Sequence, residues 1–261
     1  MSIWEAIVLG VIQGLSEFLP ISSSGHLELA NYLFGISESG SLQFAIAVHG
    51  ATVLSIIVVF FREIIGILAG VFKFRLNDQT ILALNIIVSL VPILFVGLMF
   101  KDQIEALFTG NILVVGIMLL FTSVLLTFSH FTSSGSRPIT PKRAFIIGIA
   151  QAVAVMPGLS RSGATISAGL IQGIDRKNAA KFSFLMILIP VIGMNLLELL
   201  NASSKGDSVG APALIAGFLS AFLVGTFACR WMIRLVERGK LIWFAIYCAI
   251  VGIVAIALYL I

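Results

Sequence analysis

Six apolar segments recur along this 261-residue chain, and each is long enough to cross a lipid bilayer, which takes about 17 to 25 helical residues. They cover approximately 41–61, 81–100, 111–129, 182–199, 212–232 and 241–261. Of all residues 59% are hydrophobic and only 11% are charged, whereas soluble domains carry about a quarter charged residues. The sequence therefore predicts an all-α integral membrane protein, because a helix satisfies its own backbone hydrogen bonds in lipid.

Two further apolar regions, 3–34 and 144–177, are each interrupted near the middle by a turn rich in proline, glycine and serine. The first turn runs from Pro20 to Gly25, and the second runs from Pro157 to Gly163. Proline cannot continue a helical hydrogen-bond ladder, and the arms on either side are too short to span a bilayer. We therefore expect two re-entrant hairpins, each made of a short helix, a polar turn and a second short helix.

The two interrupted regions also resemble each other. With a common offset of 138 residues, Gly10, Gln13, Ser24, Gly25 and Phe44 recur as Gly148, Gln151, Ser162, Gly163 and Phe182, and Pro20 recurs as Pro157 one residue out of step. Residues 1–130 and 144–261 are then two repeats of a single membrane domain, each with one hairpin and three spans. Because three is odd, the second repeat is expected to lie upside down relative to the first, as in proteins that bind a ligand near the membrane midplane.

Positive charges are distributed unevenly over the predicted loops. If the loop after the first span is cytoplasmic, thirteen lysines and arginines between Arg62 and Lys240 fall on that side, whereas only Lys101 and Lys205 fall on the other. Cytoplasmic loops of membrane proteins carry an excess of such residues. The charges therefore predict outward-facing termini and hairpins that enter the membrane from opposite faces.

The first turn gathers polar residues, which are costly inside a membrane and are therefore candidates for function. Gln13 and Glu17 are four residues apart and share one helical face. Residues 22–24 are all serine, and serine is a preferred N-cap for a following helix. Since only one sharp turn separates Glu17 from Ser23 and His26, we expect these three side chains to face one small cavity.

The second turn has the composition of a phosphate-binding site. Glycines allow the backbone to approach a ligand, and the N–H groups that begin the next helix are free to bind an anion. Arg161 adds a permanent planar charge suited to phosphate oxygens. The alternative is a structural ion pair between Glu17 and Arg161 that only holds the hairpins together. The predicted anion-binding residues of the two turns are Ser22, Ser24, Gly158, Ser160, Ser162, Gly163 and Thr165.

Three other residues that could bind metals receive the simpler interpretation. His49 lies inside a predicted span, and we interpret it as a buried histidine whose ring is satisfied locally. Cys229 and Cys248 fall in apolar stretches, where we expect them to act as small buried hydrophobic side chains.

Both turns resemble the signatures of a known family. The stretch Gln13-Gly-Leu-Ser-Glu17-Phe-Leu-Pro20-Ile-Ser-Ser23-Ser-Gly-His26 is similar to the first signature of the undecaprenyl pyrophosphate phosphatase family, also called bacitracin-resistance proteins. The stretch Pro157-Gly-Leu-Ser160-Arg161-Ser162-Gly-Ala-Thr165 is similar to the second. The motifs have the right order and separation, and the resemblance extends over essentially the whole chain.

This resemblance implies an inner-membrane enzyme that hydrolyses undecaprenyl pyrophosphate to the monophosphate and so recycles the carrier lipid for cell-wall synthesis. It implies a divalent metal, magnesium or calcium, served by Gln13 and Glu17. Ser23 and His26 would handle attack or proton transfer, and Arg161 with its neighbouring hydroxyls would hold the pyrophosphate. Many family members carry glutamate where this chain has Gln13, so the metal is expected to be held more weakly or to depend more on the substrate's phosphates.

The residues alone leave other functions open. Inverted repeats with broken helices are also the architecture of transporters, so the lipid phosphate could be carried rather than cleaved. The third possible function is that of a lipid-binding or assembly protein without enzymatic activity. The expected partners are a polyprenyl pyrophosphate and the bilayer, with no nucleic acid, and a homodimer is left open. We expect the cavity to open toward the outer, periplasmic face.

Overall fold

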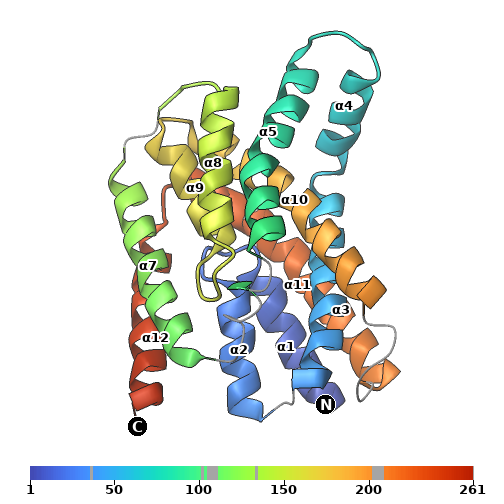
Figure 1. Ribbon diagram of the computed structural model, residues 1–261, viewed down its shortest axis with the longest axis vertical. Coiled ribbons are helices and arrows are strands. Elements are labelled where there is room, and N and C mark those ends of the chain that lie inside the picture. Colours follow the sequence, from blue (N-terminus) through green and yellow to red (C-terminus); the bar gives the residue numbers. More distant parts are fainter. Residues whose placement is uncertain (36–37, 101–102, 105–110, 133–134, 202–208, 261) are drawn as a thin grey trace.

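The computed structural model describes residues 1–35, 38–100, 103–104, 111–132, 135–201 and 209–260, without the side chains of 38–42 and 198–201. These residues form helices and no strand (Figure 1). The helices are α1 (Ile3–Ser16), α2 (Ser23–Phe34), α3 (Glu38–Val59), α4 (Phe61–Val71), α5 (Asp78–Met99), α7 (Ile112–Phe131), α8 (Pro141–Val153), α9 (Arg161–Ile171), α10 (Arg176–Asn201), α11 (Ala211–Glu237) and α12 (Ile242–Leu260). The predicted all-α class is confirmed.

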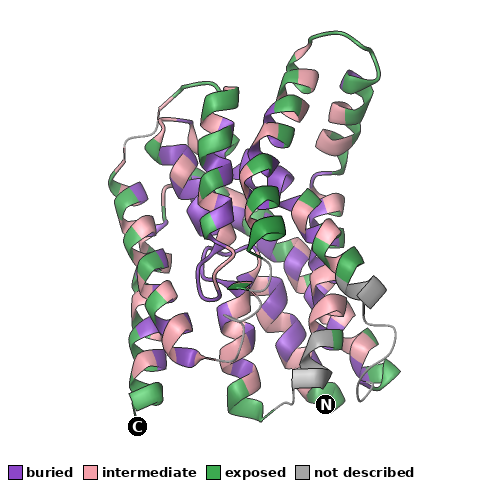
Figure 2. Cartoon of the chain, viewed as in Figure 1, coloured by how far each residue is buried: buried purple, intermediate pink, exposed green. Residues whose placement is uncertain are grey.

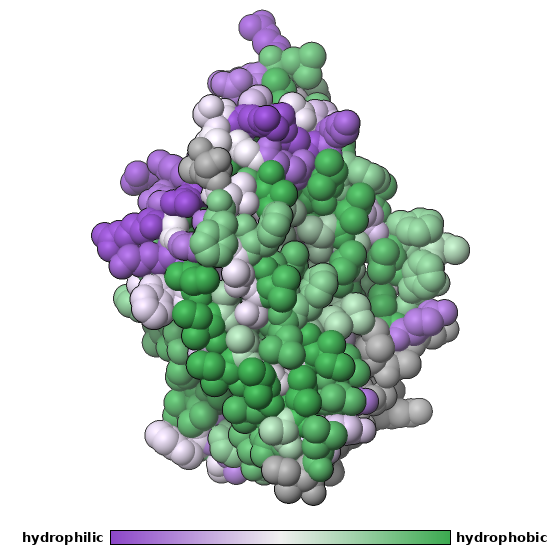
Figure 3. Space-filling view, turned by 90° about the vertical axis from the view of Figure 1, so that its left-hand side faces the viewer, coloured by the Kyte–Doolittle hydropathy of each residue, from purple (hydrophilic) through white to green (hydrophobic). Residues whose placement is uncertain are grey.

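Each of the six predicted spans corresponds to a long helix. Helices α5, α7, α10, α11 and α12 are long and apolar enough to cross a membrane, and α3 with α4 provides a sixth candidate across a bend of 73°. Large apolar side chains such as Leu94, Phe128, Leu223 and Ile253 remain exposed. Figure 3 shows hydrophobic side chains over most of one face of the molecule, with hydrophilic side chains gathered toward one end. Such a surface suits lipid, and the chain is a multi-pass membrane protein.

The helix α4 was not expected from the sequence. The chain bends between Val59 and Phe61, where neither proline nor glycine marks a break. The predicted span ends at residue 61, close to the end of α3 at Val59. The charged pair Arg62-Glu63 that follows was expected to begin a loop, whereas it lies in the first turn of α4, whose Phe61, Ile65 and Leu68 are exposed.

The two regions predicted as hairpins each form two short helices joined by a turn. In Figure 1, α1 and α2 occupy the lower half of the molecule, α8 and α9 occupy the upper half, and both turns lie near the middle. The two chain ends lie at the same end of the molecule in this view. This arrangement agrees with hairpins that enter from opposite sides, while the inverted relation of the two repeats stays a prediction.

The first arm of each hairpin packs against a span of the other half. Helix α1 packs chiefly on α11, and α8 packs chiefly on α5. A Cβ atom at Gly10 would collide with the carbonyl oxygen of Gly217, and one at Gly148 would collide with that of Ser89. Glycine therefore permits the close approach of the helices at both interfaces, as is common between membrane helices.

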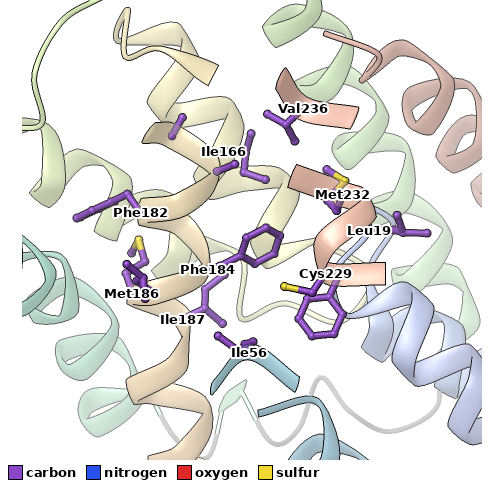
Figure 4. Close-up of a cluster of buried hydrophobic side chains, with 14 of the residues drawn as sticks. Leu19, Ile56, Ile166, Phe182, Phe184, Met186, Ile187, Cys229, Met232 and Val236 are labelled. Atoms are coloured by element: carbon purple, nitrogen blue, oxygen red, sulfur yellow. The ribbon is translucent and has the colours of Figure 1, made fainter. Parts of the chain in front are cut away.

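A buried apolar cluster lies behind the first turn. Phe184 of α10 packs against Phe18, which directly follows Glu17, and against Phe60, with ring centroids 5.9 and 6.0 Å apart. Figure 4 shows Phe184 among side chains that include Met232 and Cys229 of α11. Figure 2 shows that the turns at the centre of the molecule are largely buried, whereas the outer helix faces are exposed. The site residues are thus held on a packed support.

Candidate active site

The first turn is a short, strained link between α1 and α2. Ser22 is the N-cap of α2, and its hydroxyl accepts a hydrogen bond from the N–H of Gly25 at 3.3 Å. The backbone of Ser22 has φ +70°, a conformation that costs a non-glycine residue about 1–3 kcal/mol. The packed surroundings must stabilise this turn, which presents residues 22–24 toward the second hairpin.

Glu17 is the centre of the polar contacts in this turn. Its Oε2 accepts a hydrogen bond from the hydroxyl of Ser23 at 2.5 Å and another from Nε2 of Gln13 at 2.9 Å. The Nε2 atom of His49 lies 3.8 Å from the same oxygen. The side chain of Glu17 is only 8% exposed, so these contacts take the place of water. A serine hydroxyl that donates to a buried carboxylate is arranged for removal of its proton.

The second turn has the same capping pattern as the first. Ser160 is the N-cap of α9 and accepts from the N–H of Gly163 at 3.0 Å. The hydroxyls of Ser160 and Ser162 lie 3.3 Å apart, as do those of Ser22 and Ser24 in the first turn. The N-caps Ser22 and Ser160 are also 138 residues apart, the offset of the sequence repeat.

The two turns touch each other. The hydroxyl of Ser162 donates to the carbonyl of Leu19 at 3.4 Å. A Cβ atom at Gly25 would lie 3.1 Å from Cα of Gly158, and one at Gly163 would lie 3.2 Å from Cβ of Pro20. Gly158 and Gly163 therefore contribute by allowing close contact of backbones, and Gly158 also has φ +89°, which disfavours other residues.

A small polar pocket lies between the turns. It encloses about 20 Å³, roughly the space of one water molecule. The first turn contributes its carboxylate and serines, the second contributes Arg161 and two serines, and α2 and α9 both begin here. The lining residues are Ser16, Glu17, Ser22, Ser23, Ser24, Leu159, Ser160, Arg161, Ser162 and Ile187. Two helix N-termini and a guanidinium group at one point favour an anion.

The comparisons with known proteins identify the family of the chain. The family model described as bacitracin resistance protein BacA matches residues 6–254. The chain belongs to the BacA family. Relatives named undecaprenyl-diphosphatase from Bacteroides thetaiotaomicron and Parabacteroides distasonis are each 50% identical to it, over 98% of both chains. A relative of the same name from Korarchaeum cryptofilum is 38% identical, over 99% of this chain and all of its own length. The resemblance drawn from the two turns is confirmed.

Of the predicted site residues of this BacA-family chain, five do not line the pocket: Gln13, His26, Gly158, Gly163 and Thr165. Thr165 and His26 have their polar groups turned to other partners. The hydroxyl of Thr165 is fully buried and donates within α9, to the carbonyl oxygen of Arg161 at 2.9 Å or to that of Ser162 at 3.3 Å. The ring of His26 turns toward α12, with Nδ1 2.8 Å from the Ser22 carbonyl oxygen and Nε2 2.8 Å from the Tyr247 hydroxyl. Both residues support the turns from behind in this structure.

Three residues near the pocket were not linked to the two turns by the sequence analysis. The Nδ1 atom of His49 does face a local carbonyl, that of Ala45 at 2.9 Å, as expected of a satisfied histidine, but its Nε2 reaches Glu17. Thr122 of α7 accepts from the N–H of Ser160 at 3.2 Å. Tyr247 of α12 contacts His26. All three lie on spans far from the turns in sequence, and no local pattern links them to the motifs.

The oxygen atoms of the first turn fit a divalent cation only in part. Magnesium and calcium bind oxygen ligands, and Oε1 of Gln13 is buried without a hydrogen-bond partner among the described residues. Beside it stands the carboxylate of Glu17. The described part of the chain has no group of three acidic, histidine or cysteine side chains that could hold a metal. This donor set suits a cation shared with phosphate oxygens of a ligand, rather than one enclosed by protein alone.

Proposed function

We propose that this chain hydrolyses undecaprenyl pyrophosphate to undecaprenyl phosphate and inorganic phosphate, and thereby recycles the carrier lipid for cell-wall synthesis and confers bacitracin resistance. The relatives' shared name and the family's description support this activity. The observation that carries the proposal is the hydrogen bond from Ser23 to Glu17 in a pocket that Arg161 also lines. One turn offers a nucleophile with its base, and the other offers an anion-binding site.

In the proposed reaction, the Ser23 hydroxyl attacks the terminal phosphorus while Glu17 accepts its proton. The new Oγ–P bond forms as the bond from phosphorus to the bridging oxygen breaks, and undecaprenyl phosphate leaves. Water then attacks the phosphorus of the phosphoserine, the Oγ–P bond breaks, and inorganic phosphate leaves. Glu17 returns its proton to the Ser23 oxygen and accepts a proton from the attacking water, and this second proton is afterwards released to solvent. Arg161 and the N–H groups of α9 bind the transferring oxygens, whose charge they stabilise.

A divalent cation, magnesium or calcium, belongs to the proposal, with Gln13 and Glu17 as its protein ligands. When bound, it would neutralise charge on the pyrophosphate. Because Gln13 is neutral, this chain relies on the ligand's own phosphates for much of the cation's coordination. This part of the proposal rests on the unpartnered oxygen of Gln13.

We further propose that the enzyme lies in the bacterial cytoplasmic membrane and that the pocket opens to the outer face. The uneven distribution of positive charge supports outward-facing termini, so that the first hairpin, which carries Glu17 and Ser23, enters from the outer face.

Phosphate release by purified protein in detergent tests the function directly, because transport produces no phosphate. We expect release from a long prenyl pyrophosphate and at least a hundredfold loss in Arg161→Ala, the size typical for removal of one transition-state donor. Arg75→Ala is the matched control, since Arg75 is exposed in the α4–α5 loop. Release of no phosphate by the wild-type protein, or near-normal release by Arg161→Ala, would reject the proposal.

The same assay separates the two candidate nucleophiles. Ser23→Ala should abolish turnover, and the wild-type enzyme quenched during turnover should carry phosphate on Ser23, detectable by mass spectrometry. A Ser23→Ala enzyme that keeps most of its activity would make water the nucleophile, with Glu17 as its base.

A further inference from the structure

We infer that Tyr247 is a positioning residue of this enzyme, which acts through His26 to hold the strained turn that carries Ser23. The inference rests on the proposed function, and it assigns to α12 a part in the site that neither turn motif contains. It follows from the hydrogen bonds of the His26 ring, whose two nitrogens both have partners.

The proton on the His26 ring is located by its first partner. Nδ1 lies 2.8 Å from the carbonyl oxygen of Ser22, which can only accept a hydrogen bond. Nδ1 therefore carries the proton. The same carbonyl also accepts from the backbone N–H of His26 at 3.2 Å, so His26 binds it twice.

The second partner follows from the first. A neutral histidine has one ring N–H, so Nε2 of His26 is an acceptor. The hydroxyl of Tyr247, 2.8 Å away, must then be the donor. The two rings also stack, with centroids 5.5 Å apart and an angle of 12° between their planes. A hydroxyl from α12 thus fixes both the tautomer and the orientation of His26.

The chain of contacts ends at the nucleophile. Ser22 is the residue with φ +70°, and the next residue, Ser23, donates to Glu17 at 2.5 Å. Neither His26 nor Tyr247 lines the pocket, whereas Ser22 and Ser23 do. His26 therefore reaches the reaction through the backbone of Ser22, and Tyr247 reaches it through His26.

Tyr247→Phe tests the inference because it keeps the stacked ring and removes only the hydroxyl. We expect kcat for phosphate release to fall roughly fivefold, the effect of losing one such hydrogen bond, with KM unchanged. Tyr259→Phe is the matched control, since Tyr259 is an exposed tyrosine on the same helix. A Tyr247→Phe enzyme with wild-type kcat would overturn the inference.

Two substitutions of His26 distinguish a positioning role of its ring from a role in proton transfer, because each places an amide nitrogen near one of the two ring nitrogens. The amide nitrogen of asparagine reproduces the donor at Nδ1, and that of glutamine is placed closer to Nε2. We expect His26→Asn to retain more activity than His26→Gln, and Tyr247→Phe to have no further effect in the His26→Asn background. Equal and complete loss in both His26 variants would mean that the ring itself transfers a proton, and would overturn the inference.

NMR of the histidine ring nitrogens needs no substrate, so it tests the contact between Tyr247 and His26 separately from the proposed enzymatic function. The ¹⁵N chemical shifts of histidine ring nitrogens differ between protonated and unprotonated atoms, and the His26→Asn spectrum assigns the His26 signals. We expect an unprotonated Nε2 in the wild-type protein and a shifted Nε2 signal in Tyr247→Phe. Identical spectra would reject the contact even if the wild-type enzyme is active, whereas an inactive wild-type enzyme with the expected spectra would reject only the proposed function.

Discussion

Gln13 and Glu17 show how one neutral side chain alters a site. Nε2 of Gln13 donates to Glu17 at 2.9 Å, which fixes the carboxylate and leaves Oε1 of Gln13 without a partner among the described residues. A glutamate at position 13 could not donate this hydrogen bond. Two buried carboxylates at that distance repel each other unless a cation lies between them.

Gln13→Glu should therefore make the protein more dependent on magnesium or calcium. When a chelator removes the cation, the variant should have a lower melting temperature than the wild-type protein, and added cation should reduce this difference. Half-maximal phosphate release by the variant should require roughly tenfold less cation, which corresponds to about 1.4 kcal/mol of added binding free energy. Thermal melting and a cation titration of activity measure the two effects. Gln79→Glu adds the same charge at an exposed position and should change neither. An equal cation requirement in Gln13→Glu and the wild-type protein would remove Gln13 from the metal site.

The Gln13–Glu17 contact could be predicted because helical residues four apart share a face. The proximity of both turns' polar residues could be anticipated from the repeat. The approach of His49 to Glu17 could not, because it depends on how α1 packs against α3. The sequence favoured a satisfied histidine, and the local hydrogen bond to Ala45 agrees with that, but ring orientation across a helix interface is decided by tertiary packing.

Among the elements, α7 supports the second turn, and the hydroxyl of Thr122 is its polar contact. Thr122 accepts from the N–H of Ser160 at 3.2 Å, and its own proton lies within reach of the carbonyl oxygens of Met118 and Gly158. These groups are buried, so the backbone of the turn has no water to replace the threonine. The position of Arg161, the next residue after Ser160, depends on this support.

Thr122→Val should lower the free energy of unfolding by about 1–3 kcal/mol, because it leaves the buried N–H of Ser160 unpaired while keeping the side chain's shape. It should also raise KM for the prenyl pyrophosphate, since the anion site loosens. Thr127→Val on the same helix is the control, because the Thr127 hydroxyl bonds only to Ser123 one turn earlier. If both variants melt and turn over alike, Thr122 does not support the turn.

Helix lengths and breaks were largely predictable at this scale, because lipid requires long apolar helices and proline interrupts them. The bend between α3 and α4 was not predictable. The predicted span ends at residue 61, close to the bend, but the charged pair Arg62-Glu63 that follows is typical of a loop and does not reveal that a further helix begins there.

In the whole molecule, the two halves interlock. Since α1 packs on α11 and α8 packs on α5, the first arm of each hairpin is held by the opposite half, while α9 also packs on α10 of its own half. The pocket lies where the two hairpin turns touch, near the middle of the long axis (Figure 1). The face from which each hairpin enters the membrane is therefore the property to test at this scale.

Single cysteines can test that topology, because both native cysteines are fully buried and should not react. The excess of lysine and arginine in the loops on one side predicts that this side is cytoplasmic. A cysteine at position 32 or 260 (Tyr32→Cys, Leu260→Cys) should then face outward, and a cysteine at position 74 or 142 (Phe74→Cys, Lys142→Cys) should face the cytoplasm. All four positions are exposed. A membrane-impermeant maleimide should therefore label the first two in intact cells and the last two only after permeabilisation. Tyr32 lies near the end of the first hairpin, in α2, and Lys142 lies at the beginning of the second, in α8. Labelling of both from one side would mean that the hairpins enter from the same face and would contradict the inverted repeat.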